Sequence, residues 1–366
     1  MTNSSANARD AVSGSTAEHR FPWKWCLNDL LRVPKNGLKV FSCFSCGGGS
    51  SMGYKLAGYD VIGNVEIDPR VMKIYQNNNH PKYPYLMDVR DFLKIPDEEL
   101  PEDLFHLDIL DGSPPCSVFS TAGDREKAWS KEKVFREGQA KQKLDDLFFY
   151  FIRIAEKLKP RVVIAENVSG LIKGNAKGYV NEIFKAFDAA GYKTQLFLLN
   201  SAFMGVPQRR ERCFFIAQRK DQRFAKLILR FNEETIPFGK VRSEHGVPID
   251  PISAKATYEY LKHMEPTDRA ISDIKERRFG KGSNFNDTIY RDCDVAQTIT
   301  ASGQGIRAYD KSWLSDMDCV NTTTFPQDYD FGDQIAKYVC GMSVPPVMMA
   351  QIGTEIFEQW FSMEGK

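Results

Sequence analysis

Short apolar runs alternate with amphipathic stretches along the first two thirds of the chain. We interpret as strands the apolar runs near residues 39–44, 61–67, 105–111, 161–165, 195–200 and 213–217. Between them, residues 144–158 and 180–190 have apolar positions at helical spacing, and Gly191 follows as a helix-ending glycine would. This alternation predicts an α/β fold in which helices cover both faces of a parallel sheet.

The alternation weakens after Gln218. Residues 219–290 are rich in charge, Gly, Pro and Asn, so they predict a second, smaller and irregular domain built from loops. Regular structure resumes over residues 333–339 and in a terminal helix over 347–361. At the other end, residues 1–20 are small and polar and predict a disordered leader, followed by an aromatic patch at 21–25 that docks on the folded body.

Length and composition exclude several classes of protein. With 366 residues and 42% hydrophobic content, the chain can bury the core of one large and one smaller domain. No apolar run approaches the roughly 20 residues of a membrane span, and the N-terminus lacks a signal-peptide core. The eight cysteines are scattered, which favours the reducing cytoplasm over a disulfide scaffold. Cys43 and Cys46 lack a second pair or a histidine cluster, so we expect packing under a glycine loop and no metal site.

The distribution of charge is more informative than its sum. The formal net charge is only +1, but basic residues outnumber acidic ones over residues 124–143 and 207–230. Such clusters indicate phosphate contacts, although each one alone is also compatible with a solvated charged face.

A segment whose backbone is constrained by two prolines follows the run Leu107-Asp108-Ile109-Leu110 and leads to a cysteine. Pro114 and Pro115 fix the backbone before Cys116, so the thiol projects from the carboxyl end of a strand. This arrangement suits a nucleophile, but from these residues alone a structural cysteine remains equally open.

Polar residues follow other predicted strands at their carboxyl ends. A triple glycine, Gly47 to Gly49, follows the first strand, and Glu66 ends the second. A glycine loop admits close approach of a ligand, and an acid at the second strand suits ribose hydroxyls. The glycines lack the G-x-G-x-x-G spacing, so a nicotinamide oxidoreductase is not favoured. Glu166 and Asn167 end a third apolar run.

Several sequence blocks together resemble the DNA (cytosine-5)-methyltransferases, over about residues 38–218 and 290–362. The blocks occur in the family's order and are Phe44-Ser45-Cys46-Gly47-Gly48-Gly49, Glu66, Asp88, Gly112 to Cys116, Glu166-Asn167-Val168, Gln208-Arg209-Arg210-Glu211-Arg212 and Gly341-Met342-Ser343-Val344-Pro345-Pro346. Each block alone is unspecific, whereas their joint occurrence is highly specific. The resemblance is to the stand-alone bacterial or phage type, because no regulatory domains precede the catalytic part.

The resemblance implies a Rossmann-like class I S-adenosylmethionine-dependent methyltransferase domain with a smaller target-recognition domain. It implies that the Cys116 thiolate adds to C6 of a flipped-out cytosine, that protonated Glu166 stabilises the ring at N3, and that Arg212 holds the base at O2. Arg210 joins Arg212 as an electropositive neighbour of the thiolate. For Glu166 to keep its proton near neutral pH, we expect it to be buried when substrate is bound.

The resemblance also assigns binding residues. The cofactor S-adenosylmethionine would contact Phe44, Ser45, Cys46, Gly47, Gly48, Gly49, Glu66, Ile67, Asp88, Val89, Pro114, Leu147, Met342 and Ser343. Of these, Glu66 would accept both ribose hydroxyls and Asp88 the adenine amine, while Phe44 and Leu147 are also explained by core packing. The DNA substrate would contact Asn167, Ser117, Gln208, Arg278 and Lys281. This chain departs from the family at Cys46 for glycine, Ser117 for glutamine and Met342 for asparagine.

The predicted organisation follows from these blocks. It comprises a leader at 1–36, a catalytic domain at 37–218, a target-recognition domain at 219–340 with 219–290 most variable, and a terminal helix at 341–366 returning to the catalytic domain. We expect a cytoplasmic monomer in a bacterial or phage-infected cell, with double-stranded DNA as partner and a cognate restriction endonuclease as a candidate. An RNA cytosine-5 methyltransferase and a non-catalytic DNA-binding relative remain alternatives.

Overall fold

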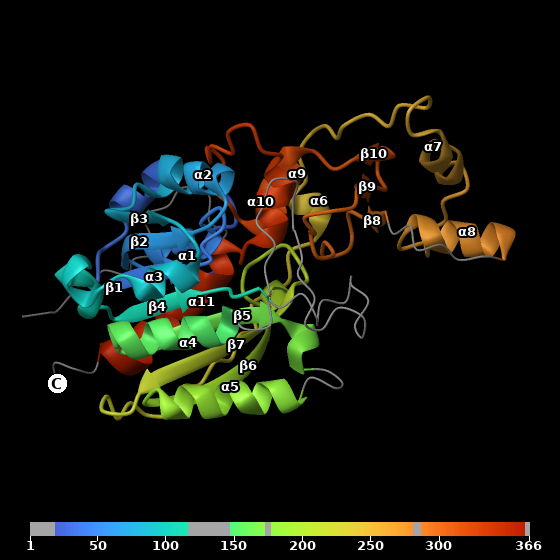
Figure 1. Cartoon of the computed structure of the whole chain (residues 1–366). Helices are drawn as coiled ribbons and strands as arrows, with labels where there is room; N and C mark the ends of the chain where they lie inside the picture. Colours follow the sequence, from blue (N-terminus) through green and yellow to red (C-terminus); the bar gives the residue numbers. More distant parts are fainter. Residues whose placement is uncertain (1–18, 116–146, 173–176, 281–286, 363–366) are drawn as a thin grey trace, which may run out of the picture. The chain divides into compact units, whose positions relative to one another are not determined.

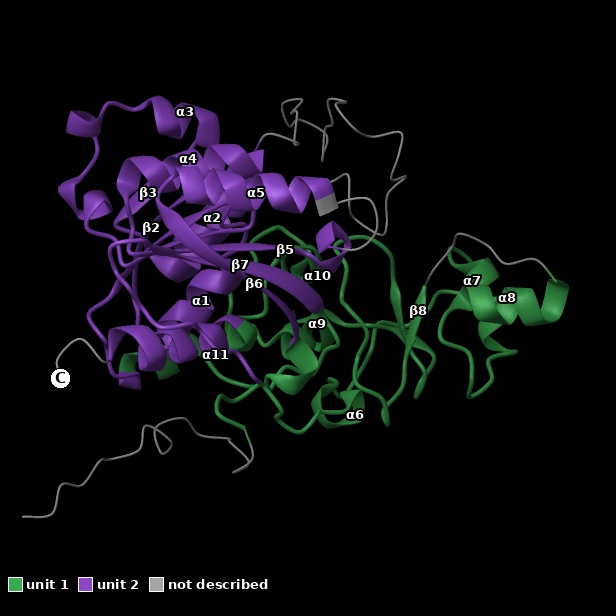
Figure 2. Ribbon diagram, turned by 90° about the horizontal axis from the view of Figure 1, so that it is seen from below, with its two compact units in different colours: residues 1–31, 201–210, 231–348 green, residues 32–200, 211–230, 349–366 purple. Residues whose placement is uncertain are grey.

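The computed structural model describes residues 19–115, 147–172, 177–280 and 287–362. The chain forms two compact units, drawn in purple and green in Figure 2. The large-sheet unit comprises residues 32–200, 211–230 and 349–366, and the small-sheet unit comprises 1–31, 201–210 and 231–348. Within the described ranges, none of the helices combines the length and apolar character that a membrane span requires.

The large-sheet unit is built on seven strands in the order β3-β2-β1-β4-β5-β7-β6 (Figure 1). The strands are β1 (Lys39–Cys43), β2 (Asp60–Glu66), β3 (Tyr83–Leu86), β4 (Ile109–Gly112), β5 (Val162–Val168), β6 (Tyr192–Asn200) and β7 (Glu211–Arg219). The first five pair in parallel, whereas β7 runs antiparallel to both β5 and β6. The α/β prediction is confirmed, with the correction that the sheet is not parallel throughout.

Helices cover both faces of this sheet. The elements between its strands and after them are α1 (Gly49–Leu56), α2 (Pro69–Asn79), α3 (Val89–Lys94), α4 (Leu147–Leu158), α5 (Lys177–Ala189) and α11 (Pro346–Ile356), the last continuing as a π-helical turn over Phe357–Phe361. Figure 2 shows α3, α4 and α5 on one side of the sheet and α1 and α11 on the other. Asp68 and Asp88 cap α2 and α3 by accepting from backbone N–H groups two residues on, which sets where each helix begins.

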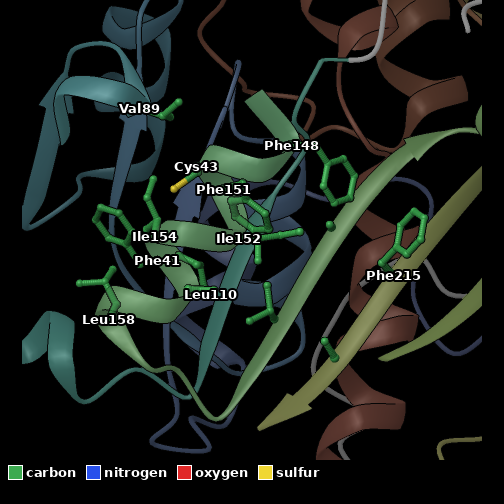
Figure 3. Packing of buried hydrophobic residues seen from close by; sticks show 14 of the residues in the cluster. Phe41, Cys43, Val89, Leu110, Phe148, Phe151, Ile152, Ile154, Leu158 and Phe215 are labelled. Carbon is green, nitrogen blue, oxygen red and sulfur yellow. The ribbon is translucent and has the colours of Figure 1, made fainter. Parts of the chain in front are cut away.

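The main core lies between the sheet and α3 to α5. Figure 3 shows Phe148, Phe151 and Ile152 of α4 pointing onto the strands, near Leu110 and Cys43. Gly112 is required at the end of β4 because a Cβ there would lie 2.5 Å from Phe151 Cε2. The close approach of α4 fixes the strand end from which the diproline loop departs.

The small-sheet unit contains a three-stranded sheet in the order β10-β9-β8. Its strands and helices are α6 (Phe238–Val241), α7 (Lys255–Leu261), α8 (Ile271–Phe279), β8 (Thr288–Tyr290), β9 (Gly305–Arg307), β10 (Ser312–Trp313), α9 (Asp316–Thr323) and α10 (Ala336–Met342). A separate core joins α7 and α8 to the strands through Leu261, Ile271, Ile274, Ile289 and Ile306. Residues 219–290 therefore hold helices where the sequence predicted mainly loops.

The aromatic patch near the N-terminus packs within the small-sheet unit. Trp25 is 2% exposed, and its indole Nε1 donates to the Thr324 carbonyl oxygen at 2.9 Å. The preceding leader to residue 18 lies outside the described residues, as does the whole basic segment 124–143.

Candidate active site

The glycine loop between β1 and α1 has a strained backbone at two residues that carry side chains. Phe44 has φ 53° and Cys46 has φ 47°, and both values lie in the left-handed region. Gly48, with φ 86°, also has a positive φ. Glycine takes this conformation without steric cost, whereas other residues pay about 1 kcal/mol or more. Cys46 thus stands at a position whose backbone favours glycine, and its side chain is half-buried.

Glu66, at the end of β2, is held rigidly by the backbone around it. Its Oε1 accepts from the N–H groups of Ile67 and Asp68 at 2.9 and 3.0 Å, and its Oε2 accepts from Cys46 N at 2.8 Å. Burial raises the pKa of this carboxyl, and the three backbone hydrogen bonds only partly offset that effect. A carboxylate offers about four acceptor positions, so roughly one remains for a ligand hydroxyl.

Asp88, at the start of α3, has its carboxylate engaged by one arginine. Arg90 donates from its backbone N and Nε to Oδ1 at 2.8 and 2.9 Å, and from Nη2 to Oδ2 at 2.6 Å. Burial acts in the opposite direction, but these hydrogen bonds and the Arg90 charge lower the pKa of Asp88 overall. The side chain is therefore an oriented, charged acceptor, and Arg90 is a contributor that the sequence reasoning missed. The residues that follow these two acids were also assigned to the cofactor. Ile67, after Glu66, is exposed, whereas Val89, after Asp88, is buried in the core.

The end of β4 carries the loop toward Cys116. Gly112 and Pro114 are buried, and the Asn167 side-chain Nδ2 donates to the Pro114 carbonyl oxygen at 3.0 Å. Since β4 and β5 are adjacent parallel strands, this bond ties the diproline loop to the strand that bears Glu166. Asn167, predicted to contact substrate, thus positions the loop through its own side chain.

Glu166 and Arg212 form a nearly buried ion pair across β5 and β7. Arg212 Nε lies 2.9 Å from Glu166 Oε1, with side-chain exposures of 15% and 10%. The register explains the meeting, because Val168 pairs with Arg212 and Glu166 lies two residues earlier on the same strand face. Glu166 is 8% exposed. The site therefore combines a fixed carboxyl group and a fixed guanidinium beside the diproline loop.

Two aromatic or aliphatic residues assigned to the cofactor contribute to the core. Leu147 is 2% exposed at the start of α4. Phe44 is half-buried and packs against the same core, with its ring centroid 6.5 Å from that of Phe151. Both have the packing role that the sequence left open, and Phe44 retains an accessible surface. Ser45 is buried and accepts from Asn64 Nδ2 at 2.8 Å.

The remaining predicted residues belong to the small-sheet unit. Gln208 is buried and donates to the Thr322 carbonyl oxygen at 3.2 Å. Arg210 is 2% exposed and donates to the carbonyl oxygens of Ile299 and Gly341 at 3.2 and 3.0 Å. These contacts give Arg210 a structural role in its own unit, so of the two arginines we carry only Arg212 forward as a candidate for catalysis.

Met342 and Ser343 end α10 in the same unit. Met342 is exposed, and the Ser343 hydroxyl is buried without a hydrogen-bond partner among the described residues. Arg278 is exposed on α8. Cys116, Ser117 and Lys281 lie outside the described residues. In the described part of the chain, no group of His, Cys, Asp or Glu side chains has the arrangement of a metal site.

A family model described as C-5 cytosine-specific DNA methylase matches residues 38–358. The Type II methyltransferase M.FnuDI of Fusobacterium nucleatum is 33% identical over 258 residues, which is 70% of this chain and 61% of that protein. M.NgoPII of Neisseria gonorrhoeae is 35% identical over 190 residues, which is 51% of this chain and 49% of that protein. The chain thus spans about half of the length of the curated relatives it matches.

Solved structures share the fold over most of this chain. A putative DNA modification methyltransferase encoded within an E. coli prophage superposes with a TM-score of 0.62 at 19% identity, covering 88% of this chain and 99% of that one. DNMT2 of Spodoptera frugiperda gives 0.59 at 14% identity, covering 88% and 100%. At these identities the likeness concerns the fold alone.

Proposed function

This chain belongs to the C-5 cytosine-specific DNA methylase family, and from that premise we propose that it transfers a methyl group to C5 of cytosine in a specific duplex sequence. The observation that carries the proposal is the Glu166–Arg212 pair, fixed beside the loop that leads to Cys116. A nucleophile, an acid and a cation are what activation of an electron-poor cytosine ring requires.

We assign the chemical roles as follows. The Cys116 thiolate adds to C6 of cytosine, and Glu166, which takes up a proton from solvent when the base binds, delivers it to N3 and neutralises the charge that develops on the ring. The Arg212 guanidinium, fixed on β7, donates to the base at O2 and orients Glu166. After C5 has taken the methyl group, a solvent water removes the C5 proton, the bond between C6 and the Cys116 sulfur breaks, the thiolate leaves, and the N3 proton returns to Glu166. The target atom is inaccessible inside a stacked duplex, so the base is flipped out, at a cost of a few kcal/mol.

The residues at the ends of β1 and β2 fit the adenosyl part of S-adenosylmethionine. Three backbone N–H groups hold the Glu66 carboxylate in place, and one of its acceptor positions remains for a ribose hydroxyl. Asp88, held by Arg90, is an oriented acceptor for the adenine amine. When bound, this cofactor supplies an electrophilic methyl group. Because three backbone N–H groups already occupy Glu66, we revise the expected pair of ribose hydroxyls to one strong hydrogen bond.

We assign DNA recognition to the small-sheet unit, in particular to residues 231–290, the part of the predicted variable segment 219–290 that belongs to this unit. This part of the chain holds none of the catalytic blocks, and α8 presents the exposed Arg278, which precedes Lys281 by three residues in the sequence. Phosphate contacts position a protein on DNA, whereas contacts to base edges read the sequence. We therefore place the catalytic reaction on the large-sheet unit and sequence choice on the small one.

Covalent trapping tests the proposal. Duplex DNA containing 5-fluorocytosine, incubated with the protein and S-adenosylmethionine, is expected to yield a denaturation-resistant adduct, because fluorine cannot leave as a proton does. Cys116→Ser should bind the same duplex and give no adduct and no methyl transfer. Parallel assays on transfer RNA separate a DNA enzyme from an RNA enzyme. The absence of any adduct, or equal labelling of transfer RNA, would contradict the proposed function.

A further inference from the structure

A fully buried carboxyl group lies at the end of β4, one residue before Gly112. Asp111 is 1% exposed, and its Oδ2 accepts from Ser42 Oγ at 2.9 Å while its Oδ1 accepts from Tyr54 OH at 3.2 Å. Ser42 belongs to β1 and Tyr54 to α1, so the carboxyl joins three elements of the large-sheet unit. Neither the catalytic assignment nor the cofactor contacts above use it.

This group lies at the edge of the sheet where ligands bind in folds of this class. Ser42 and Asp111 are register partners at the carboxyl ends of two adjacent parallel strands. The glycine loop leaves β1 directly after Cys43, and α1, which carries Tyr54, begins at the end of that loop. Ligands of open α/β sheets bind outside the carboxyl ends of the strands. Asp111 therefore stands one residue before the end of β4, opposite Ser42 on the neighbouring strand from which the glycine loop departs.

In the part of the chain that the structure describes, no basic side chain pairs with this carboxyl group. Among the described residues, Asp111 forms no ion pair with Lys, Arg or His, and its partners are two neutral hydroxyls. The titratable groups that interact with it are Cys43 on β1, Tyr54 on α1, Tyr75 on α2 and Glu166 on β5. All four are acids, and the Arg212 guanidinium is paired with Glu166.

Burial raises the pKa of Asp111 to about 7, the Ser42 and Tyr54 hydrogen bonds act against this, and the Glu166 charge adds to it. Near neutral pH the protonated and the ionised forms of this carboxyl group are therefore both populated. A positive charge brought close to it would favour the ionised form, and by linkage the ionised form would favour the positive charge.

We propose that the Asp111 carboxylate is the counter-charge for the cationic sulfur of S-adenosylmethionine, so that binding of the methyl donor releases the proton of Asp111 to solvent. This inference rests on the proposed function and deepens it. The Asp111 carboxylate would make the site selective for the charge of the ligand. The donor carries a positively charged sulfonium, whereas the demethylated product, S-adenosylhomocysteine, has a neutral thioether and the same zwitterionic tail. Transfer of the methyl group then removes the charge that Asp111 holds, which favours release of the product.

The test compares the affinities of the two nucleosides for the full chain by calorimetry between pH 6 and pH 8.5. In the wild type, the preference for S-adenosylmethionine over S-adenosylhomocysteine should rise at least about fivefold across this range. Titrations in phosphate and in Tris at pH 7 should show proton release with the donor and not with the product. Protonation of Glu66 affects both nucleosides alike, since they share the ribose, so it cancels from the ratio.

Three variants test whether the pH dependence of the preference comes from Asp111. Asp111→Asn should lose both the pH dependence of the preference and the proton release. Tyr54→Phe removes a hydrogen bond that lowers the pKa of Asp111, so the midpoint of the change should move to higher pH. Glu166→Gln removes a neighbouring negative charge and should move it to lower pH. The opposite shifts test the inference even if Asp111→Asn fails to fold.

The outcomes separate this inference from the proposed function. A preference that is constant with pH in the wild type, or that keeps its pH dependence in folded Asp111→Asn, would overturn the inference alone. Unshifted midpoints in Tyr54→Phe and Glu166→Gln would do the same. Binding of neither nucleoside would overturn the proposed function and this inference with it.

Discussion

Arg212 Nε lies 2.9 Å from Glu166 Oε1, so a cation of β7 and a carboxylate of β5 meet across an antiparallel strand pair at the carboxyl end of β5. Both side chains are nearly buried, and so the pair is costly to break and well defined in position. The antiparallel direction of β7 is what brings Arg212, near its start, beside Glu166, near the end of β5.

The first prediction concerns this pair. Arg212→Ala should lower the free energy of unfolding by about 3 kcal/mol, because it leaves the Glu166 charge largely buried without its partner. Glu166→Gln should retain most of the stability but lose most methyl transfer, since the amide has no proton to deliver to N3. In the double variant, Glu166→Gln should recover much of the stability lost in Arg212→Ala. Urea unfolding of the four proteins gives the coupling free energy.

A coupling free energy near zero in that cycle would contradict the structural role of the pair. Methyl transfer by Glu166→Gln at close to the wild-type rate would show that Glu166 is not the acid. These two results are independent, because stability is measured without substrate and transfer is measured under native conditions.

The second prediction concerns Gly112. In Gly112→Ala the new Cβ would lie 2.5 Å from Phe151 Cε2, and the ring is enclosed in the core. We expect a loss of about 1 to 3 kcal/mol in unfolding free energy, as in other overpacked cores. Gly178→Ala is the matched control, because a Cβ at Gly178 meets no atom within 4 Å and should be neutral or slightly stabilising.

Thermal and urea unfolding of both variants measure the difference. Adding Phe151→Leu to Gly112→Ala should restore part of the loss by making room for the methyl group. If Gly112→Ala is as stable as the wild type, α4 does not approach β4 as closely as described, and the fixed departure of the diproline loop must have another cause.

The sequence predicts the strand ends well and the contacts between them poorly. Apolar runs ending in Glu66 and Glu166 are local patterns, and Glu66 ends β2 as expected, whereas β5 continues past Glu166 to Val168. The partners of those side chains depend on register between distant segments. Asp111 meets Ser42 and Tyr54, which are 69 and 57 residues away in the chain. No periodicity within one segment contains this information.

The helices of residues 219–290 were missed for a different reason. The nine-residue α8 buries only Ile271 and Ile274, and α7 buries only Thr257 and Leu261. So few apolar positions give too little signal against a charged background. Tertiary packing on the three-stranded sheet stabilises both helices, and this is absent from any local pattern.

The third prediction concerns pH. Because burial raises the pKa of Asp111 from 3.8 to about 7, the folded state binds its proton more tightly than the unfolded state does. The free energy of unfolding should therefore fall as pH rises through this window, by about 3 kcal/mol between pH 5 and pH 8. Asp111→Asn should lack this decline. Parallel urea titrations at several pH values give the comparison.

Glu66 contributes a decline of the same sign, since burial also raises its pKa, but it is present in both proteins. The difference between wild type and Asp111→Asn isolates Asp111. If the two proteins lose stability in parallel from pH 5 to pH 8, the Asp111 carboxyl group is not titrating in this range.

The last prediction contrasts two neighbouring arginines on α8. Arg277 donates to Glu265 Oε1 and Asp268 Oδ2 at 2.6 and 2.7 Å, and Asp268 is 3% exposed. Arg277→Ala should therefore lower stability, because it leaves the buried Asp268 carboxylate without this partner. Arg278 is exposed and forms no ion pair among the described residues, so Arg278→Ala should change stability by less than about 0.5 kcal/mol.

Only the second substitution should act directly on DNA. Arg278→Ala should weaken duplex binding. If Arg278 contacts a phosphate, the slope of log affinity against log salt concentration should fall by about one; if it contacts a base, one position of the methylated sequence should become less specific. Glu66→Ala is the control from the large-sheet unit, and it should raise the cofactor requirement without moving the methylated site. Fluorescence anisotropy in a salt series and methylation sequencing at saturating cofactor measure both effects. Unchanged binding and unchanged sequence choice in Arg278→Ala would remove α8 from the DNA interface, because its exposed arginine is the group through which the helix would contact phosphate or a base edge.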